Sequence, residues 1–176
     1  VKMTFTREED MSTSTIRHAY DIRHRTGVKK DGTITAAEVT MYSDTGAYYA
    51  IGVPQLLKAI THCCGPYRVP NISVDGNLVF TNTLSASAMR GMGVPQSCFA
   101  WEAHLDLIAQ KLGMNPVALR KKNLFDEEGQ LVNGQVVDAA PARACFEKAL
   151  KLYEVTEKLP LKPNKKRGVG IANMIY

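Results

Sequence analysis

The N-terminal quarter of the chain is organised by an alternation of apolar and polar side chains. Residues 1–7 have the period of a half-buried strand, with an apolar face made of Val1, Met3 and Phe5. Residues 15–28 are polar and rich in Arg and His, and a Lys-Asp-Gly turn signal separates them from a β-branched run over 33–43. The pattern therefore predicts a strand over 1–7, followed by a β-hairpin with one solvated face.

Residues typical of helix boundaries begin at residue 52. In GVPQLLKAITHCCG, Pro54 stands in a plausible first turn and Gly65 lies just past the end, where glycine can take the left-handed cap. Residues 72–80 return to strand-forming residues, with a possible bulge at their Asp-Gly pair. The tetrapeptide GVPQ recurs at 93–96, again before a helix, which leaves open whether two strand-turn-helix units are related by duplication.

The segment PQSCFAWEAHLDLIAQKLG predicts the longest helix of the chain, across 97–111. Pro95 is expected to start it and Gly113 to end it. The apolar stripe expected to face the core consists of Phe99, Leu105, Ile108, Ala109 and Leu112. The polar side chains that we expect on its other, solvated faces are Glu102, Asp106 and Gln110.

Two further helices are expected in the C-terminal third. An Asn-Pro pair provides an N-cap and a first turn for a short helix over 116–123. A polar loop containing Gly129 and Gly134 follows. Pro141 opens the last helix, whose apolar stripe is expected to be Cys145, Phe146, Ala149, Leu150 and Tyr153.

The end of the chain is expected to change character. The polar segment KLPLKPNKKR predicts a linker, and residues 169–176 resemble a strand.

The order of the predicted elements indicates the fold class. Because strand and helix blocks do not alternate strictly, we expect an α+β fold with two layers, helices on a mixed or antiparallel sheet, rather than a doubly wound parallel sheet. We assign a first region to residues 1–160, and a linker with the start of the next segment to 161–176.

Composition and charge are typical of an ordinary globular domain. The 176 residues, 45% hydrophobic and 22% charged, are typical of a globular chain able to bury a core in one domain. The net charge of +5 is mild, and its only dense basic run, from Lys162 to Arg167, is better explained as a solvated linker than as a nucleic-acid patch.

Cysteine usage and the ends of the chain lead to expectations about its setting. The four cysteines have neither the spacing of a disulfide framework nor that of a zinc site. No signal peptide and no stretch of eighteen apolar residues occur, so we expect a cytoplasmic protein with reduced thiols and no membrane partner. Both ends fall within strand-like patterns, which favours a piece of a longer polypeptide.

Several candidate sites have simpler explanations. The Gly-Met-Gly at 91–93 lacks the third glycine of a dinucleotide fingerprint. The His-Cys-Cys run at 62–64 cannot close a tetrahedral metal site, because neighbouring helical residues point about 100° apart; helix-end packing is favoured. Glu102 and Asp106 could act as paired carboxylates, although a solvated face is favoured. His104 has no evident partner and is expected to be structural or exposed.

The stretch SASAMRGMGVPQ, which contains Arg90, is different. Its two glycines would let the backbone approach a bulky ligand, and the helix that follows begins with unsatisfied N–H groups at its positive end. Together with the Arg90 guanidinium, these groups could bind an anionic or strongly polar ligand. A glycine-rich turn carrying a surface arginine explains the same residues equally well, so the residue pattern leaves both explanations open.

The stretch MRGMGVPQSCFAWEAHLDLIAQKLGMNPVALRKKNLF resembles the molybdenum hydroxylase family, the large subunits of xanthine dehydrogenase, aldehyde oxidase and related heterocycle and aroyl-CoA enzymes. That family's pattern is Arg-Gly-x-Gly-x-Pro-Gln, an acidic helix, Ala-x-x-Leu-Gly, Pro, Arg and Asn-Leu. The segments TREEDM, DGTITAAEV, DTGAY, YRVPNI and TN fall in the family's order. The resemblance therefore covers nearly the whole chain.

The resemblance implies part of the molybdopterin-binding domain of an oxidoreductase that hydroxylates an aldehyde or an electron-poor aromatic or heterocyclic carbon, with oxygen from water. It places Arg90, Gly91 and Gly93 at a molybdenum–molybdopterin cofactor, with the Arg90 backbone beside the metal's ligands. Met92 stands where xanthine enzymes have a substrate-stacking Phe, and Lys58 where they have a substrate-binding Arg. Both are therefore candidate substrate-binding residues, and the changes disfavour xanthine.

The resemblance also implies what must lie elsewhere. The family's glycine-rich cofactor segment is expected upstream and its glutamate general base downstream, so no catalytic residue is assigned in this chain. The remainder of the large subunit and Fe–S and FAD subunits or domains are the expected partners, together with a small-molecule substrate. The isolated chain is expected to bind no molybdenum and to be inactive. The alternative is a stand-alone basic module that binds anions or nucleic acid through its Arg, Lys and His surface.

Overall fold

The computed structural model describes residues 1–158, 160–161 and 163–176. Its helices and strands, in chain order, are α1 (Arg7–Thr13), β1 (Tyr20–Val28), β2 (Ile34–Asp44), α2 (Gly52–Thr61), β3 (Ile72–Val79), α3 (Val94–Leu112), α4 (Pro116–Asn123), β4 (Glu128–Gln130), β5 (Val136–Asp138) and α5 (Ala140–Lys158). The α+β class is confirmed. No helix within these ranges combines the length and hydrophobicity that a membrane crossing requires.

The predicted hairpin forms two strands of a three-stranded sheet. β1 pairs antiparallel with β2, and β3 joins the other side of β2 in the parallel direction, giving the order β1-β2-β3. A parallel pair needs a crossover connection, and α2 provides it. The outer face of the hairpin is solvated, as the sequence predicts, because exposed polar side chains such as Asp21, Arg23, Arg25 and Glu38 alternate with buried ones.

The prediction of a bulge in the third strand is wrong. Asp75 and Gly76 continue the regular pairing of β3 with β2, and the one shift of register in this sheet falls between Gly27 and Val28. Gly76 has a packing role instead, since a Cβ there would come within 2.5 Å of Ile60 Cδ1 on α2. The Asp-Gly pair thus lets a helix approach the strand closely.

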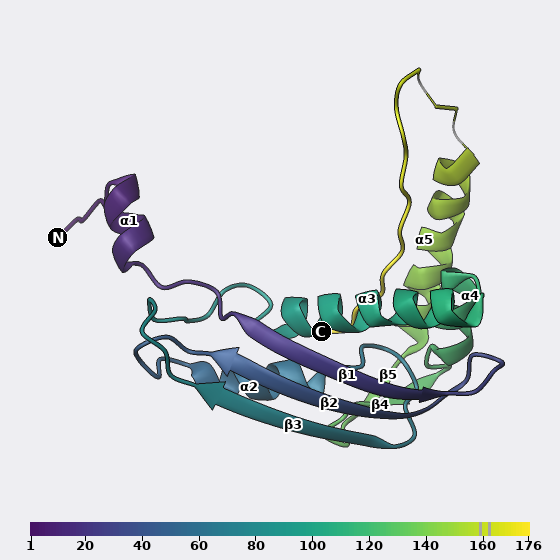
Figure 1. Cartoon of the computed structure of the whole chain (residues 1–176), viewed down its shortest axis with the longest axis horizontal. Helices are drawn as coiled ribbons and strands as arrows, with labels where there is room; N and C mark the ends of the chain where they lie inside the picture. Colours follow the sequence, from purple (N-terminus) through teal and green to yellow (C-terminus); the bar gives the residue numbers. More distant parts are fainter. Residues whose placement is uncertain (159, 162) are drawn as a thin grey trace.

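The core lies between the sheet and two helices. α2 packs against β3 and α3 packs against β1, and the two helices contact each other on one face of the sheet (Figure 1). Fully buried side chains from both layers meet there, among them Ile34, Val39, Met41, Leu56, Ala59, Tyr67, Trp101, Leu105 and Leu119. This is the predicted two-layer arrangement.

The helix α3 begins and ends close to the predicted limits, but its buried face differs from the prediction. Leu105 and Ala109 are fully buried, whereas Phe99 is 77% exposed and Trp101 takes its place in the core. Glu102, expected in solvent, is only 6% exposed. With 19 residues α3 is no longer than α5, which also has 19.

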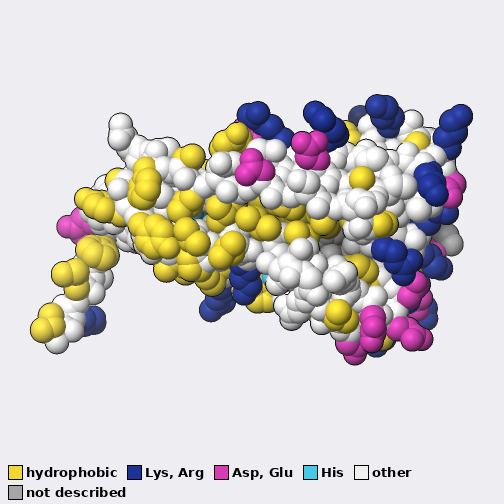
Figure 2. All heavy atoms as spheres, turned by 90° about the horizontal axis from the view of Figure 1, so that it is seen from below, with side chains coloured by type: hydrophobic (Ala, Val, Ile, Leu, Met, Phe, Trp, Pro, Cys, Tyr) yellow, Lys and Arg dark blue, Asp and Glu magenta, His cyan; other side chains and the backbone are white. Residues whose placement is uncertain are grey.

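The N-terminal strand prediction is also wrong. Residues 1–6 form no regular element and are exposed, and α1 follows with a capping box in which Thr6 and Glu9 bond each other's backbone N–H. Figure 1 shows α1 standing away from the sheet, so no neighbouring strand is available to residues 1–6. In Figure 2 the same end projects from the body as a largely hydrophobic tail.

The C-terminal third contains a hairpin that the sequence pattern missed. The loop expected around Gly129 and Gly134 carries the antiparallel pair β4–β5. The last helix is confirmed, but only Phe146 of its predicted stripe is fully buried and Cys145 is exposed. Residues 169–176 are not a strand; they run back beside α3 (Figure 1), where Ile171 packs against the main core.

Candidate functional site

The turn before α3 is the most unusual backbone in the described part of the chain. Gly91, Met92 and Gly93 have successive φ values of +92°, +41° and +92°. Hydrogen bonds from Met92 N to Met89 O (2.8 Å) and from Val94 N to Gly91 O (2.9 Å) close the turn. A left-handed conformation is costly for a residue with a side chain, so Met92 is held there by the two glycines and the helix that follows.

The two glycines are required by the chain itself. A Cβ on Gly91 would lie 2.5 Å from Pro95 Cγ, and a Cβ on Gly93 would lie 2.7 Å from Gln55 O and 2.9 Å from Ala59 Cβ. The two GVPQ segments thus meet where α2 and α3 come together. The close approach predicted from the glycines exists, although the groups approached here belong to the turn and to α2.

The turn presents unpaired hydrogen-bond donors to its surroundings. Within the described ranges, the Arg90 side chain is exposed and forms no hydrogen bond or ion pair, and the N–H groups of Gly91 and Gln96 have no backbone or side-chain acceptor. Arg17 Nη2 donates to Arg90 O at 3.0 Å, while Arg17 Nη1 is buried without a partner. This donor set suits an anionic, oxygen-rich group.

An open apolar basin of about 750 Å³ adjoins the turn. Its lining residues are Ala88, Met89, Arg90, Gly91, Met92, Pro95, Met174 and Tyr176. The Lys58 Nζ atom lies 3.9 Å from the centre of the Tyr176 ring. Of the five residues that the sequence analysis selected, Arg90, Gly91 and Met92 line the basin and Gly93 belongs to the same turn, whereas Lys58 is not in the lining and contacts it only through Tyr176, which was not selected.

Helix α3 also carries a buried ionic network that serves the fold. Arg120, 1% exposed, donates from Nε to Glu102 Oε2 (2.6 Å) and from Nη1 to Asp106 Oδ1 (2.7 Å). Tyr67 donates its hydroxyl to Glu102 Oε1 at 2.7 Å, and burial raises the pKa of that phenol. The paired carboxylates are thus tied to an arginine on α4. The prediction of a solvated face is wrong for Glu102, whereas the Asp106 side chain is 59% exposed as expected.

The asparagine of the Asn-Leu motif is likewise structural. Asn123 Oδ1 accepts from Ile34 N at 2.9 Å, and its Nδ2 donates to Gly32 O and Leu119 O, both at 2.9 Å. These bonds tie the end of α4 to the start of β2. The Arg and Asn-Leu parts of the motif are therefore explained by packing, unlike the Arg90 turn.

Three histidines line a groove between β1 and α3. His104, for which no partner was expected, has Nε2 3.0 Å from Thr26 Oγ1 and stacks on His24. Burial lowers the pKa of His24 to about 4. His18 is 2% exposed, and neither of its ring nitrogens has a hydrogen-bond partner in the described part of the chain. These rings are neutral near pH 7 and supply no charge to a ligand.

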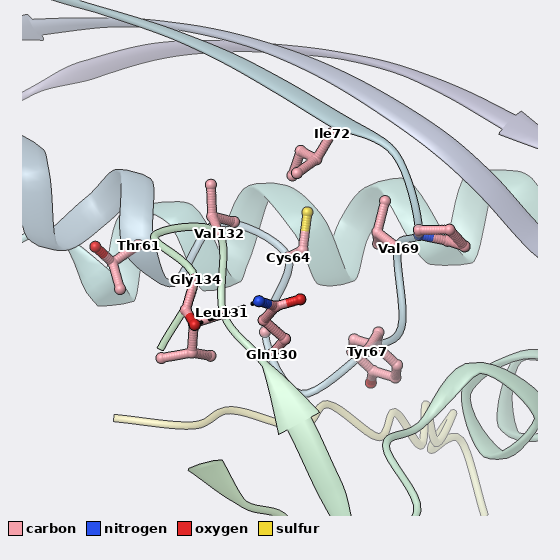
Figure 3. A pocket seen from close by; sticks show the side chains of 11 residues that line it. Thr61, Cys64, Tyr67, Val69, Ile72, Gln130, Leu131, Val132 and Gly134 are labelled. Atoms are coloured by element: carbon pink, nitrogen blue, oxygen red, sulfur yellow. Dashed lines mark hydrogen bonds between the residues drawn. The ribbon is translucent and has the colours of Figure 1, made fainter. Parts of the chain in front are cut away.

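A smaller pocket of about 180 Å³ lies between the end of α2, the start of β3 and the β4–β5 hairpin (Figure 3). Cys64 points into it near Ile72. Its Sγ lies 3.9 Å from Cys63 Sγ, and this contact together with burial raises the pKa of the Cys64 thiol. A protonated thiol among aliphatic side chains is a poor nucleophile or metal ligand, so we assign no chemistry to this pocket.

Helix-end packing of the His-Cys-Cys run is confirmed, since Cys63 and Cys64 are both buried. The part of the chain that the structure describes contains no group of three or more His, Cys, Asp or Glu side chains arranged to hold a metal ion. Lys162, the first residue of the basic run, lies outside the described residues.

Comparisons with known proteins bear on the same segment. Residues 1–124 match the molybdopterin cofactor-binding domain. The chain is 41% identical over 138 residues to the nicotinate dehydrogenase large molybdopterin subunit of Eubacterium barkeri, covering 78% of this chain and 32% of that protein. It is 33% identical over 181 residues to the xanthine dehydrogenase molybdenum-binding subunit of Escherichia coli O157:H7, covering 100% of this chain and 24% of that protein.

Solved structures give the same picture. The aldehyde oxidoreductase from Desulfovibrio gigas aligns with a TM-score of 0.79 at 31% identity, over 86% of this chain and 17% of that one. A reconstituted CO dehydrogenase from Oligotropha carboxidovorans aligns with a TM-score of 0.73 at 26% identity, over 87% and 20%. The chain thus spans about a third or less of the length of the proteins it resembles.

Proposed function

Because the chain belongs to the molybdopterin cofactor-binding domain family of the molybdenum hydroxylases, we propose that it forms one wall of the molybdenum-cofactor site in a larger enzyme. The observation that supports this best is the turn before α3, whose consecutive positive φ values leave an arginine and backbone donors unpaired beside an open basin. The backbone N–H donors are held by the turn before a ligand arrives, and donors of this kind stabilise negative charge without reorganising.

In this proposal Arg90, Gly91 and Gly93 contact the cofactor. The bound molybdenum–molybdopterin group would supply the two-electron oxidation that incorporates oxygen from water. Arg90 would place a permanent positive charge beside the metal's ligands, where negative charge accumulates, and Arg17 would hold the Arg90 carbonyl in place. Gly91 and Gly93 give the backbone the curvature that keeps the donors directed outward.

Met92 and Lys58 are the proposed substrate-binding residues. Met92 lines the basin with an adaptable thioether, which suits a flat aromatic or heterocyclic ring. We propose an aldehyde or an electron-poor aromatic carbon as the site of hydroxylation. The relatives named for nicotinate and for aldehydes support this class, while Met92 and Lys58 in place of Phe and Arg disfavour xanthine.

The remaining parts of the enzyme are proposed to come from elsewhere. The remainder of the large subunit would bring the glycine-rich cofactor segment and the glutamate general base, and Fe–S and FAD subunits or domains would remove the electrons. We place residues 161–176 at the junction with the next segment. Four cysteines, all free, support the reducing cytoplasm as its location. Neither a nucleic acid nor a membrane is a proposed partner.

Metal analysis of two proteins tests this function. The isolated 176-residue chain is expected to contain no molybdenum and to show no hydroxylase activity, because an open half-site leaves most of a large pterin in water. The whole subunit that contains it, isolated with its Fe–S and flavin partners, is expected to contain about one molybdenum per subunit. Near-stoichiometric molybdenum in the isolated chain, or none in the complete enzyme, would show that the proposal is wrong.

A further inference from the structure

Tyr176 links Lys58 to the turn that carries Arg90. Its ring lies under the Lys58 ammonium at 3.9 Å and stacks on His62 at a centroid distance of 6.1 Å and an angle of 28°. The same ring lines the basin with Met92. A lysine near an aromatic face is attracted by the ring quadrupole, so Tyr176 restricts where the Lys58 ammonium can lie.

The position of Tyr176 is fixed by the segment that precedes it. Ile171 packs against the main core, Ile175 packs against the second cluster around Phe125, and Asn173 O lies 3.9 Å from Cys98 Sγ on α3. These contacts anchor residues 171–175 along α3, where Figure 1 places the C-terminus. Tyr176 itself remains 63% exposed, which leaves its ring available to a ligand.

The charges around the basin are unbalanced. Within the described ranges, neither Lys58 nor Arg90 forms an ion pair with a carboxylate. The basin beside Arg90 is lined mainly by apolar side chains, among them the methionines Met89, Met92 and Met174 and Pro95. A ligand that suits this surface has a planar apolar body, for the thioethers and the Tyr176 ring, and an anionic substituent for an ammonium group.

We propose that Tyr176 is a positioning and specificity-determining residue, which orients Lys58 and forms with Met92 the apolar walls that receive the ring of an aromatic carboxylate. This inference rests on the proposed function, because it takes the basin to be the substrate side of the site. Lys58 binds the carboxylate, and Tyr176 contacts the ring and sets the direction of the ammonium.

Binding of benzoate and benzamide to the complete enzyme, measured by calorimetry, separates charge from ring recognition. Benzoate is expected to bind about tenfold more tightly than benzamide. The difference corresponds to one partly exposed, charge-assisted hydrogen bond between the Lys58 ammonium and the carboxylate. Lys58→Met is expected to abolish that preference. Tyr176→Leu is expected to weaken both ligands and to reduce the preference, whereas Tyr176→Phe, which keeps the ring, retains wild-type binding of both.

Matched controls keep the test independent of folding and of the cofactor. Tyr42→Leu, on the outer face of the sheet, is expected to leave both affinities unchanged. With 4-formylbenzoate as substrate, Tyr176→Leu is expected to raise KM with little change in kcat, which a merely structural defect would not produce. Equal affinity for the two ligands in the wild type, an unchanged preference in Lys58→Met, or identical behaviour of Tyr176→Leu and Tyr42→Leu would overturn the inference.

Molybdenum content distinguishes the two proposals. A complete enzyme without molybdenum contradicts the proposed function. An enzyme that contains molybdenum but does not prefer benzoate contradicts only the role of Tyr176.

Discussion

The polar groups at the two ends of α3 differ in whether they have hydrogen-bond partners. Toward its C-terminal half, Glu102 and Asp106 are tied to a fully buried Arg120, and the hydrogen bonds of that guanidinium lie within the fold. At its N-terminus, Arg90 and nearby N–H groups have no partner in the described ranges, and the backbone adopts a costly conformation. Both ends belong to one sequence motif. The contrast indicates that one part of the motif holds the domain together, and it supports our proposal that the other part binds a ligand.

The largest loss of stability is expected in the C-terminal half of α3, where the polar side chains have hydrogen-bond partners. Arg120→Ala leaves the Glu102 carboxylate buried without its cationic partner, with only the Tyr67 hydroxyl still donating to it, and breaking such an ion pair costs about 3–5 kcal/mol. Urea unfolding of the 176-residue chain followed by circular dichroism measures this loss. Arg143→Ala removes an arginine from a more exposed pair with Asp126, so a change below about 1 kcal/mol is expected. Equal losses for the two variants would contradict the structural role of the network.

A smaller loss of stability is expected at the turn. Gly91→Ala meets both a φ of +92° and a contact of 2.5 Å with Pro95, and such local strain costs about 1–3 kcal/mol. Gly113→Ala, with a φ of +65° but open space around its Cβ, isolates the cost of the backbone alone. Gly91→Ala should therefore lose more stability than Gly113→Ala in the same unfolding assay. In the complete enzyme only Gly91→Ala is expected to lose molybdenum, and normal metal content with full activity would exclude a cofactor role for the turn.

A pH-dependent effect is expected between the two ends, where His24 packs against α3. Because burial lowers its pKa to about 4 from 6.5, the unfolded chain binds a proton between these pH values that the folded chain does not. The free energy of unfolding should therefore be greatest above pH 6.5 and fall as the pH decreases toward 4, by on the order of 2–3 kcal/mol from this group. His24→Phe should flatten the dependence. An unchanged slope in His24→Phe would show that other groups cause it.

The sequence predicted local structure well where a single residue determines it. Proline and glycine positions located α2, α3 and α4, and Asn115 caps α4 through its side chain as expected. The burial of Glu102 could not be predicted in the same way, because it depends on Arg120, eighteen residues later and on another helix. The family pattern contains both an acidic helix and a later Arg, and an expected ion pair between these two parts could have predicted that Glu102 is buried.

The candidate site was predicted only in part for a similar reason. The Arg90 turn is a local feature of the chain, and its two glycines were enough to predict it. Tyr176 and Arg17 reach the site from segments 86 and 73 positions away from residue 90, so no local pattern marks them. The alternation over residues 1–7 was misleading, since a strand also needs a neighbour, and Figure 1 shows none beside that segment.

The account depends most on Arg90, and one set of variants of the complete enzyme tests it directly. Arg90→Ala is compared with Arg25→Ala, which removes an exposed arginine from the outer face of the sheet. The measurements are the urea midpoint, the molybdenum content and kcat. Because the Arg90 side chain has no partner within the described fold, its loss should leave the midpoint unchanged. Removal of one donor from a site where negative charge accumulates should lower kcat by about a hundredfold. An Arg90→Ala enzyme with the metal content and kcat of Arg25→Ala would contradict the claim that this turn forms a wall of the cofactor site.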